Sequence, residues 1–309
     1  MRFLVVLLSL LLLFPYGTWA DELPVVRMAS LQNDLHHLPL WVAQALDLYR
    51  VEGVKVEQTA TFRAGPELMS AMVAGSIDMA FVGEAPATIT FARGAKVALV
   101  AQVNTGGSAL VVSTNCTAQK ITDLKGKRIA VPGNGTVQDF LLRRALNQKG
   151  ISFKEVKIIT LSPPEMAQAL KAGQIDAFLV WQPYPARAVQ RGEGRILMDS
   201  SELWPNHPCC ALISSESART NGLAARVVRA HKKAITYIKE HPDEAIAIAV
   251  QKTGMDETTV REALAHVVYT HVPAVAEEEE YVNFLHSLGY IKQGDARAFT
   301  REFIHSLVD

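Results

Sequence analysis

The chain has 309 residues, of which 49% are hydrophobic and 20% are charged, and its formal net charge at pH 7 is zero. A chain of this length can bury one large core or two ordinary ones. The neutral charge balance argues against a nucleic-acid-binding protein, because such proteins usually carry a basic face. We therefore expect a globular protein with no nucleic-acid partner.

Residues 1–20 are expected to be a secretory signal peptide. Arg2 precedes an apolar run over residues 3–14, which is too short to span a bilayer. Small residues then occupy the cleavage positions at Thr18 and Ala20. We expect cleavage after Ala20 and export of the mature chain to the periplasm. An uncleaved membrane anchor is the alternative interpretation.

Apolar runs separated by turn residues predict strands and helices in alternation over the first hundred residues. A polar loop over residues 31–38 leads into a helix that begins at Pro39. The predicted strands cover residues 25–29, 54–57, 79–82 and 96–103. Asn104–Ser108 reads N-T-G-G-S and is followed at once by another apolar run. We interpret this segment as a hinge that crosses between two lobes, with a plain hairpin turn as the alternative.

One stretch of the chain occurs twice, at an offset of 98 residues. Residues 66–78 and 164–176 share seven identities in thirteen positions. Each copy predicts a helix that opens with Pro-Glu, a glycine at the helix C-terminus and a buried strand. The strands end at Gly83-Glu84 and at Trp181-Gln182. Because ligands bind outside the carboxyl ends of strands in open α/β sheets, two copies indicate two similar lobes that face one cleft.

The second half of the chain continues the α/β pattern and then becomes helical. A glycine-rich loop over residues 132–136 begins a helix, and residues 204–210 form an irregular loop before a strand at 211–214. From Ala218 onward the pattern is helical to the end, including a helix over residues 256–269. The predicted first lobe is therefore residues 21–104 plus 212–309, and the second lobe is residues 105–211.

Four segments together resemble one protein family. They are Gly83-Glu84-Ala85-Pro86, the run L-K-G-K-R-I-A at 124–130, the run D-F-L-L-R at 139–143, and Ile175-Asp176 with Trp181-Gln182-Pro183-Tyr184. This ordered set is similar to the nitrate/sulfonate/taurine-type periplasmic substrate-binding proteins of ABC transporters, and most of all to the aliphatic sulfonate binders. Gln182 stands where that branch often has an acid.

The resemblance implies an α/β fold with two lobes, the type II-like periplasmic binding protein fold, and a ligand in the cleft between them. It implies an exported solute-binding component of an ABC importer, a small anionic ligand and an ABC permease in the membrane as the partner. We expect a monomer. The alternatives are an enzyme like the thiamine-pyrimidine synthases or a vitamin-precursor binder on the same scaffold, and a periplasmic sensor module.

The candidate ligand-binding residues lie at helix starts, strand ends and the hinge. Glycines followed by a threonine at a helix start favour an anion site, although the same residues also make a plain N-cap. The aromatic face and amide at the second strand end suit a small organic ligand with a polar end. The predicted site residues are Gln32, Asn33, His37, Gly83, Glu84, Gly107, Ser108, Asn134, Gly135, Thr136, Trp181, Gln182 and His207. We interpret Asp78 and Asp176 as structural caps.

The sequence offers little support for a metal, a cofactor or a catalytic centre. His207, Cys209 and Cys210 lack the usual zinc spacing, and adjacent cysteines rarely bind one metal together, so we expect no metal and no cofactor. Familiar catalytic motifs such as G-x-S-x-G and H-E-x-x-H do not occur. We therefore expect a binding protein and not an enzyme. The sequence alone does not pair Cys116, Cys209 and Cys210 in disulfides.

Overall fold

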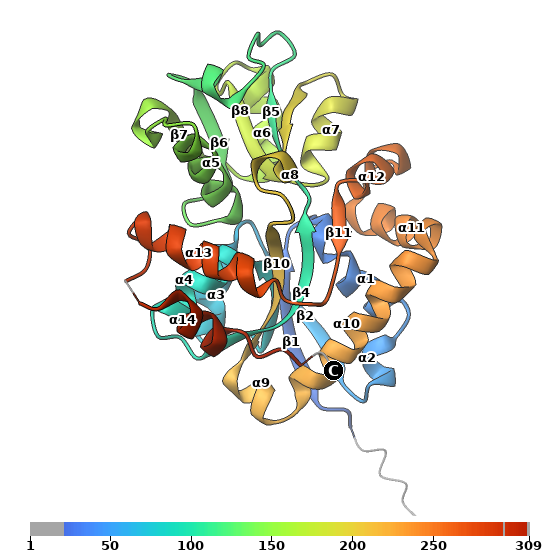
Figure 1. Cartoon of the computed structure of the whole chain (residues 1–309). Coiled ribbons are helices and arrows are strands. Elements are labelled where there is room, and N and C mark those ends of the chain that lie inside the picture. The colour runs from blue at the N-terminus through green and yellow to red at the C-terminus, as the bar shows by residue number, and fades with distance from the viewer. Residues whose placement is uncertain (1–21, 293, 308–309) are drawn as a thin grey trace, which may run out of the picture.

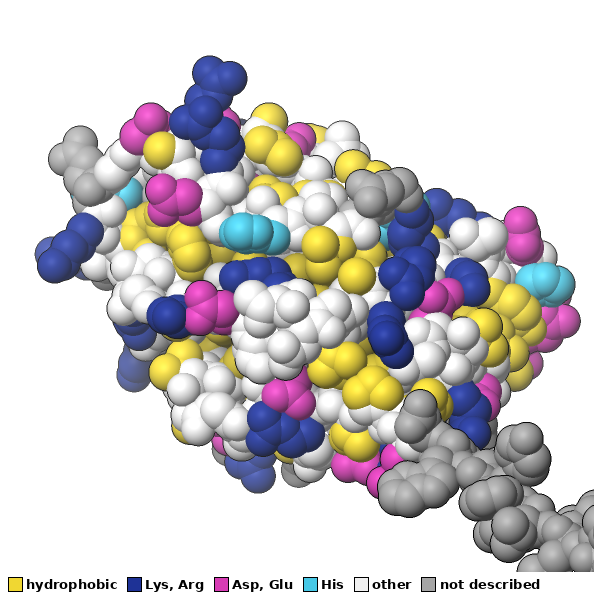
Figure 2. All heavy atoms as spheres, turned by 90° about the horizontal axis from the view of Figure 1, so that it is seen from below, with side chains coloured by type: hydrophobic (Ala, Val, Ile, Leu, Met, Phe, Trp, Pro, Cys, Tyr) yellow, Lys and Arg dark blue, Asp and Glu magenta, His cyan; other side chains and the backbone are white. Residues whose placement is uncertain are grey.

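The computed structural model describes residues 22–292 and 294–307, and the predicted signal peptide lies outside them. Two sheets, each covered by helices, form two lobes placed one above the other (Figure 1). This arrangement confirms the predicted two-lobed α/β fold. Within the described residues no helix is long and apolar enough to cross a membrane. The face that Figure 2 shows carries basic and acidic side chains interspersed with one another.

The first lobe is built on a mixed sheet with the strand order β11-β4-β10-β3-β1-β2. β1 pairs in parallel with β2 and β3, whereas β10 runs antiparallel to β3 and β4. Its strands are β1 (Val25–Leu31), β2 (Lys55–Phe62), β3 (Met79–Gly83), β4 (Val97–Gly106), β10 (Pro208–Ser215) and β11 (Val267–Tyr269). β3 is buried over its whole length, as its unbroken apolar sequence predicts.

Helices cover both faces of this sheet. Those from the first part of the chain are η1 (Leu35–His37), α1 (Leu38–Ala45), α2 (Leu48–Val51), α3 (Gly65–Val73) and α4 (Glu84–Ala92). Those from the last part are α9 (Glu216–Thr220), α10 (Leu223–Glu240), α11 (Pro242–Thr253), α12 (Glu257–Leu264), α13 (Val275–Ser287) and α14 (Ala296–Phe303). The single helix predicted over residues 256–269 is wrong: it ends at Leu264, and Val267–Tyr269 pairs with β4 as β11.

The second lobe has the strand order β7-β6-β8-β5-β9. Its strands are β5 (Ser108–Val112), β6 (Arg128–Val131), β7 (Lys157–Thr160), β8 (Ala177–Trp181) and β9 (Arg195–Asp199). Its helices are η2 (Ile121–Leu124), α5 (Val137–Gln148), η3 (Phe153–Glu155), α6 (Pro163–Lys171), α7 (Tyr184–Gln190) and α8 (Ser200–Leu203). The central strand β8 is fully buried, like its counterpart β3.

Two strands carry the chain between the lobes. β4 continues through the predicted breaker as far as Gly106, and β5 begins at Ser108 after the single residue Gly107. Gly107 has φ +87°, and a Cβ there would lie 2.2 Å from the Nε2 atom of His36, so only glycine fits this crossing. The chain returns to the first sheet in β10, which begins at Pro208 and not at residue 211 as predicted.

Contacts from the C-terminal helices hold the two lobes together. The ring of Tyr281 in α13 stacks on Phe140 in α5 with their centroids 4.0 Å apart. Tyr290 donates a hydrogen bond of 2.9 Å to an Oδ atom of Asp139. On the other side of the molecule, the Nδ1 atom of His266 lies 2.7 Å from Asp199. Side chains of the two lobes are therefore in contact on both sides of the crossing strands. The structure thus shows the two lobes in a closed arrangement.

Candidate functional site

A small cavity lies between the lobes, where the N-termini of α3, α4 and α5 converge. Its volume is about 10 Å³, which is close to the least space that holds one water molecule. None of the residues that line it is a lysine or an arginine. The lining residues are Leu31, Asp34, Gly65, Gly83, Pro86, Thr136, Val137, Gln138, Trp181, Cys209 and Cys210. They come from both lobes and from the return strand β10.

The N-terminus of α5 is shaped by the glycine-rich loop that the sequence singled out. Gly135 has φ +76°, a conformation that glycine adopts without a steric penalty. The Thr136 hydroxyl caps the helix by accepting from the Asp139 N–H at 3.2 Å, and it donates to the Gly133 carbonyl at 2.7 Å. The first N–H groups of a helix have no acceptor within the helix, so α5 presents a partial positive charge beside Thr136 and Gln138.

The end of β3 presents Gly83 to the cavity and turns Glu84 away from it. The carboxylate of Glu84 accepts from Gln102 at 2.6 Å and lies beside Glu278, which in turn accepts from Thr88 at 2.8 Å. Both carboxyl groups are completely buried. Burial raises the pKa of Glu84 to about 7, and burial together with Glu84 raises the pKa of Glu278 well above its usual range. The pair therefore retains a proton at neutral pH, which limits the negative charge near the cavity.

The end of β8 presents Trp181. Its side chain is 2% exposed and lines the cavity, and its indole N–H has no partner within the described residues. Gln182 points elsewhere, because its Oε1 atom accepts from the Ala186 N–H at 3.2 Å. Its backbone joins the lobes: the carbonyl accepts from the Leu35 N–H at 3.1 Å, and the N–H donates to the Gly107 carbonyl at 2.8 Å.

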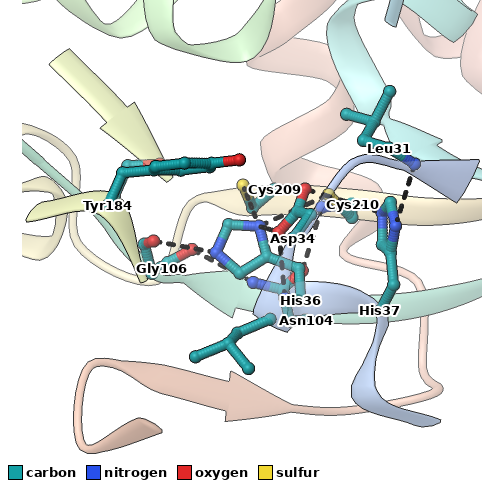
Figure 3. Close-up of polar contacts among 12 residues, drawn as sticks. Leu31, Asp34, His36, His37, Asn104, Gly106, Tyr184, Cys209 and Cys210 are labelled. Carbon is teal, nitrogen blue, oxygen red and sulfur yellow. Dashed lines mark hydrogen bonds and ion pairs between the residues drawn. The ribbon is translucent and has the colours of Figure 1, made fainter. Parts of the chain in front are cut away.

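The loop after β1 contributes Asp34 and His36. Asp34 caps the short helix η1 by accepting from the His36 N–H at 3.0 Å. The Gly107 carbonyl lies 2.8 Å from Nε2 of the His36 ring. The two cysteines lie on the Nδ1 side of the ring (Figure 3). His37 points away, since its Nδ1 atom accepts from the Leu31 N–H at 3.3 Å.

Four buried side chains converge beside the cavity, and we call Asp34, His36, Cys209 and Cys210 the His36 cluster. The Nδ1 atom of His36 lies 3.6 Å from the Cys209 sulfur, 3.5 Å from the Cys210 sulfur and 3.2 Å from an Oδ atom of Asp34 (Figure 3). Each of the four side chains is at most 2% exposed. Such close packing of three acidic groups around one imidazole couples their protonation.

The electrostatics of the His36 cluster favour one thiolate paired with one imidazolium. Burial opposes charge on His36, but Asp34 and Cys209 outweigh it and raise the pKa of His36 to about 9. Burial also opposes the thiolate of Cys209, but Cys210 and His36 hold the pKa of Cys209 well below its ordinary value. Burial and the neighbouring Cys209 raise the pKa of Cys210 well above its ordinary value, and burial raises the pKa of Asp34 to about 7.

The arrangement differs from a nucleophile–base–acid relay. In such a relay the nucleophile and the acid bind opposite ring nitrogens of the histidine. Here both sulfurs and the carboxylate approach Nδ1, and Nε2 is occupied by a carbonyl group. The two sulfurs and the carboxylate of the cluster therefore surround one atom, His36 Nδ1, and do not form a proton-relay chain through the ring.

The structure brings some of the sequence-predicted residues together and separates others. Gly83, Thr136 and Trp181 line the cavity, and Gly107 contacts His36. His207 stacks on Trp204 beside the cluster. The remaining predicted residues lie off the cavity wall: Glu84, His37, Ser108, Gly135 and Gln182 are buried nearby, Asn33 is half-buried, and Gln32 and Asn134 are exposed. The Ser108 hydroxyl accepts from Gln138 at 3.0 Å.

Several residues of the cavity wall were not among those predicted from the sequence. Asp34 lies in the same loop as the predicted Gln32 and Asn33, and Gln138 lies at the same helix start as Thr136, so proximity to predicted residues was the available signal. Gly65 lies just before the first repeat copy, and a Cβ there would lie 2.5 Å from Pro86. The missed residues are Leu31, Asp34, Gly65, Pro86, Val137, Gln138, Cys209 and Cys210.

Comparison with known proteins identifies the family. The model of the NMT1-like family matches residues 21–253, which is most of the chain. The chain belongs to the NMT1-like family. A relative from Escherichia coli (strain K12) that is named for binding aliphatic sulfonates is 26% identical over 219 residues, 70% of this chain and 68% of the relative.

Solved structures show the same fold for this NMT1-like protein. The alkanesulfonate-binding protein of Xanthomonas axonopodis pv. citri, bound to MOPS, has a TM-score of 0.80 at 24% identity, over 93% of this chain and 100% of that one. The ligand-binding component of an ABC-type import system from Staphylococcus aureus, with zinc bound, has a TM-score of 0.78 at 18% identity, over 92% and 100%. These likenesses confirm the predicted resemblance and the periplasmic binding protein fold.

Proposed function

We propose that this protein is the exported solute-binding component of an ABC importer, and that its lobes close around a small anionic ligand. The relatives support a ligand of the sulfonate, nitrate or taurine class. The observation that carries the proposal is the convergence of three helix N-termini from both lobes on one interlobe cavity. Helix N-termini bind anions through their free N–H groups and the helix dipole.

The electrostatics of the cavity wall support recognition of an anion by dipoles. The wall has no lysine or arginine, so the helix starts at Gly83 and Thr136 supply positive potential there, while the imidazolium of His36 offsets the thiolate of Cys209 in the same wall. The nearest glutamate, Glu84, shares a proton with Glu278 and faces away. Excluding water from this space strengthens each N–H contact, because the local dielectric constant is low.

Closure is the step that couples the ligand to transport. Gly83 belongs to the first lobe and Thr136 to the second, so a ligand contacts both helix starts only when the lobes are together. Ligand binding therefore shifts the protein from an open to a closed population. At about 10 Å³ the cavity is smaller than an organic sulfonate, so side chains of the cavity wall must rearrange to admit such a ligand.

We also propose a cellular location, a membrane partner and an oligomeric state for the protein. One structural neighbour is the ligand-binding component of an ABC-type import system, and one relative is named a taurine-binding periplasmic protein. These names support a periplasmic location after cleavage at Ala20, an ABC permease as the partner in the membrane and no catalytic step. We further propose that the protein acts as a monomer with about residues 21–104 plus 212–309 as one lobe and about 105–211 as the other; the first sheet extends a few residues past these bounds, to Gly106 and from Pro208. The convergence of the His36 cluster on one nitrogen does not favour the enzyme alternative.

A thermal-shift and calorimetric panel tests the proposed function. The mature protein is titrated with taurine, alkanesulfonates, nitrate, bicarbonate and pyrimidines. One anion class is expected to bind, with roughly 2.7 kcal/mol of stabilisation at about 100 times its dissociation constant. Thr136→Val should weaken that anion about fivefold, because the hydroxyl caps the helix start that presents free N–H groups to the cavity and loss of such a cap costs about 1 kcal/mol, whereas Thr136→Ser should retain binding. Selective binding of a pyrimidine would contradict the proposal.

A further inference from the structure

The His36 cluster is not explained by anion recognition. It contains two thiols and a carboxyl group, all of which lose a proton to become negative, and Asp34, Cys209 and Cys210 line the cavity. The imidazolium of His36 offsets one negative charge, and ionising a second buried group costs free energy unless a further cation compensates it. Its donor atoms are thiolate sulfur, imidazole nitrogen and carboxylate oxygen, which are the ligand types that bind zinc in proteins.

Three distances from the His36 Nδ1 atom match edges of a coordination tetrahedron. Bonds of about 2.3 Å to sulfur and about 2.0–2.1 Å to nitrogen and oxygen place sulfur and nitrogen about 3.5 Å apart, and nitrogen and oxygen about 3.3 Å apart. The His36 Nδ1 atom lies 3.5 and 3.6 Å from the two sulfurs and 3.2 Å from Asp34 Oδ1. The donor atoms of His36, Cys209 and Cys210 all lie within 4.8 Å of one another.

The surroundings fix the ring of His36 in the orientation that a metal ligand requires. Its Nε2 atom lies 2.8 Å from the Gly107 carbonyl, which can only accept. The Nε2–H therefore donates, and in the neutral ring the lone pair of Nδ1 points at the sulfurs. Metal-binding histidines usually donate their second N–H to a carbonyl or carboxylate in this way.

His37 has the opposite arrangement and lies beside Asp34. Its Nδ1 atom accepts from the Leu31 N–H, so the neutral ring carries its proton on Nε2. That nitrogen lies 3.7 Å from Asp34 Oδ2, and neither atom has a hydrogen-bond partner within the described residues. His37 therefore faces the carboxyl group of Asp34 and not the two sulfurs.

An irregularity in β10 explains how the consecutive residues Cys209 and Cys210 both approach the Nδ1 atom of His36. Successive side chains of a regular strand point to opposite faces of the sheet. The pairing of β10 with β4 shifts between Pro208 and Cys210, so Cys209 is an extra residue, and it shifts again before Ala211. A bulge re-aims side chains locally, and here it places both sulfurs beside the same nitrogen of His36.

We propose that His36, Cys209 and Cys210 bind a thiophilic divalent cation of the Zn²⁺ type beside the interlobe cavity. Asp34 belongs to a separate group of close donor atoms with His37 and Cys210, so we do not count it among the three ligands. The proposed site opposes the expectation of no metal, which considered His207 as the partner of the cysteines; the geometry replaces His207 with His36. It does not depend on the transported ligand. One ligand comes from the loop after β1 and two come from the return strand β10, so the cation would also fix the crossing between the lobes.

Metal titration of the reduced, chelator-treated mature protein tests the proposal. Zn²⁺ is titrated in competition with a chromophoric chelator, and one equivalent should bind with release of protons from the thiols. Co²⁺ should give the near-ultraviolet charge-transfer band of thiolate ligands and the visible bands of tetrahedral coordination. Cys209→Ser, Cys210→Ser and His36→Gln should each weaken Zn²⁺ by more than the roughly 10–100-fold that loss of an outer partner costs.

Matched control variants distinguish Zn²⁺ binding at this site from nonspecific Zn²⁺ binding to any thiol. Cys116→Ser, in the second lobe, and His207→Gln, next to the cysteines in sequence, should leave Zn²⁺ affinity within about threefold of wild type. Circular dichroism checks that each variant is folded. Absence of stoichiometric Zn²⁺ binding by the reduced protein would overturn the proposal, and so would equal binding by the wild type and the Cys209→Ser/Cys210→Ser double variant. Anion binding is measured independently in the thermal-shift panel, so failure of the metal site and failure of the proposed function are distinguishable.

Discussion

The two copies of the repeat are nearly the same at the start of their strands and different at the end. Before β3, Asp78 accepts from the Arg27 backbone N–H at 2.8 Å and binds its guanidinium; before β8, Asp176 does the same with Arg128. In each case the helix of the copy ends near a glycine with positive φ, Gly75 or Gly173. The repeated residues therefore form the same Asp–Arg clamp, Asp78 with Arg27 and Asp176 with Arg128, once in each lobe and away from the cavity. The aspartates, which the sequence suggested were structural caps, also form ion pairs with these arginines.

The ends of the same two strands have diverged. β3 ends at Gly83, which leaves space and begins α4, whereas β8 ends at Trp181, which fills space with an aromatic ring. Each residue lines the cavity. The comparison indicates that the repeat preserves the scaffold, while the unequal strand ends determine the shape of the site.

The largest effect is expected at the aromatic strand end. Trp181 is one of the largest fully buried side chains, so Trp181→Ala should lower the free energy of unfolding by about 3–5 kcal/mol and abolish ligand binding. Chemical denaturation followed by circular dichroism measures the first effect, and calorimetry measures the second. Trp181→Phe should retain most of the stability. Wild-type affinity in Trp181→Ala would contradict a cavity-lining role.

A smaller effect is expected at the glycine strand end. A Cβ at Gly83 would lie 2.9 Å from a methyl group of Val137 in the opposite lobe, so Gly83→Ala should oppose closure. Overpacking of this kind costs about 1–3 kcal/mol, which corresponds to ligand affinity roughly 5- to 150-fold weaker. The double variant Gly83→Ala/Val137→Ala should recover most of the affinity. Failure of this rescue, with both proteins folded, would show that the clash does not control closure.

The carboxyl pair behind the glycine strand end should make stability fall with rising pH. The folded-state pKa of Glu84 is raised to about 7 and that of Glu278 is raised further. The stabilisation is therefore fully present below the unfolded pKa of about 4.3 and is lost as pH rises through the folded values, at up to about 1.4 kcal/mol per pH unit for each proton. Glu278→Gln should flatten the pH profile of the melting temperature above pH 5. An unchanged profile would contradict proton sharing.

The smallest effects should be equal in the two copies. The aspartates of the two clamps are 22% and 28% exposed, so solvent screens each ion pair, and Asp78→Asn and Asp176→Asn should each cost about 1 kcal/mol. Their arginine partners lower both folded pKa values. This contribution is present above the unfolded pKa of about 3.9 and is lost as pH falls through the folded values. Urea denaturation at pH 7 should give closely similar values, and a severalfold difference would break the comparison.

Much of the fold could be predicted from the sequence because its signals are local. The repeat, the buried strands β3 and β8 and the glycine-rich start of α5 depend on short-range patterns of apolar residues and glycines. β11 could not be predicted, because Val267–Tyr269 becomes a strand only through its pairing with β4. The His36 cluster was missed for a similar reason: the distant loop after β1 and the bulge in β10 bring His36 and the cysteines together, and neighbouring residues suggested His207 instead.

Small-angle X-ray scattering with and without saturating ligand tests the central claim, that two lobes with unequal strand ends close on an anion between helix starts. The wild-type protein is expected to become more compact when the anion identified by the panel is added. Gly83→Ala should need a higher anion concentration for the same change. A radius of gyration that stays constant while calorimetry records saturating binding would contradict closure around the ligand.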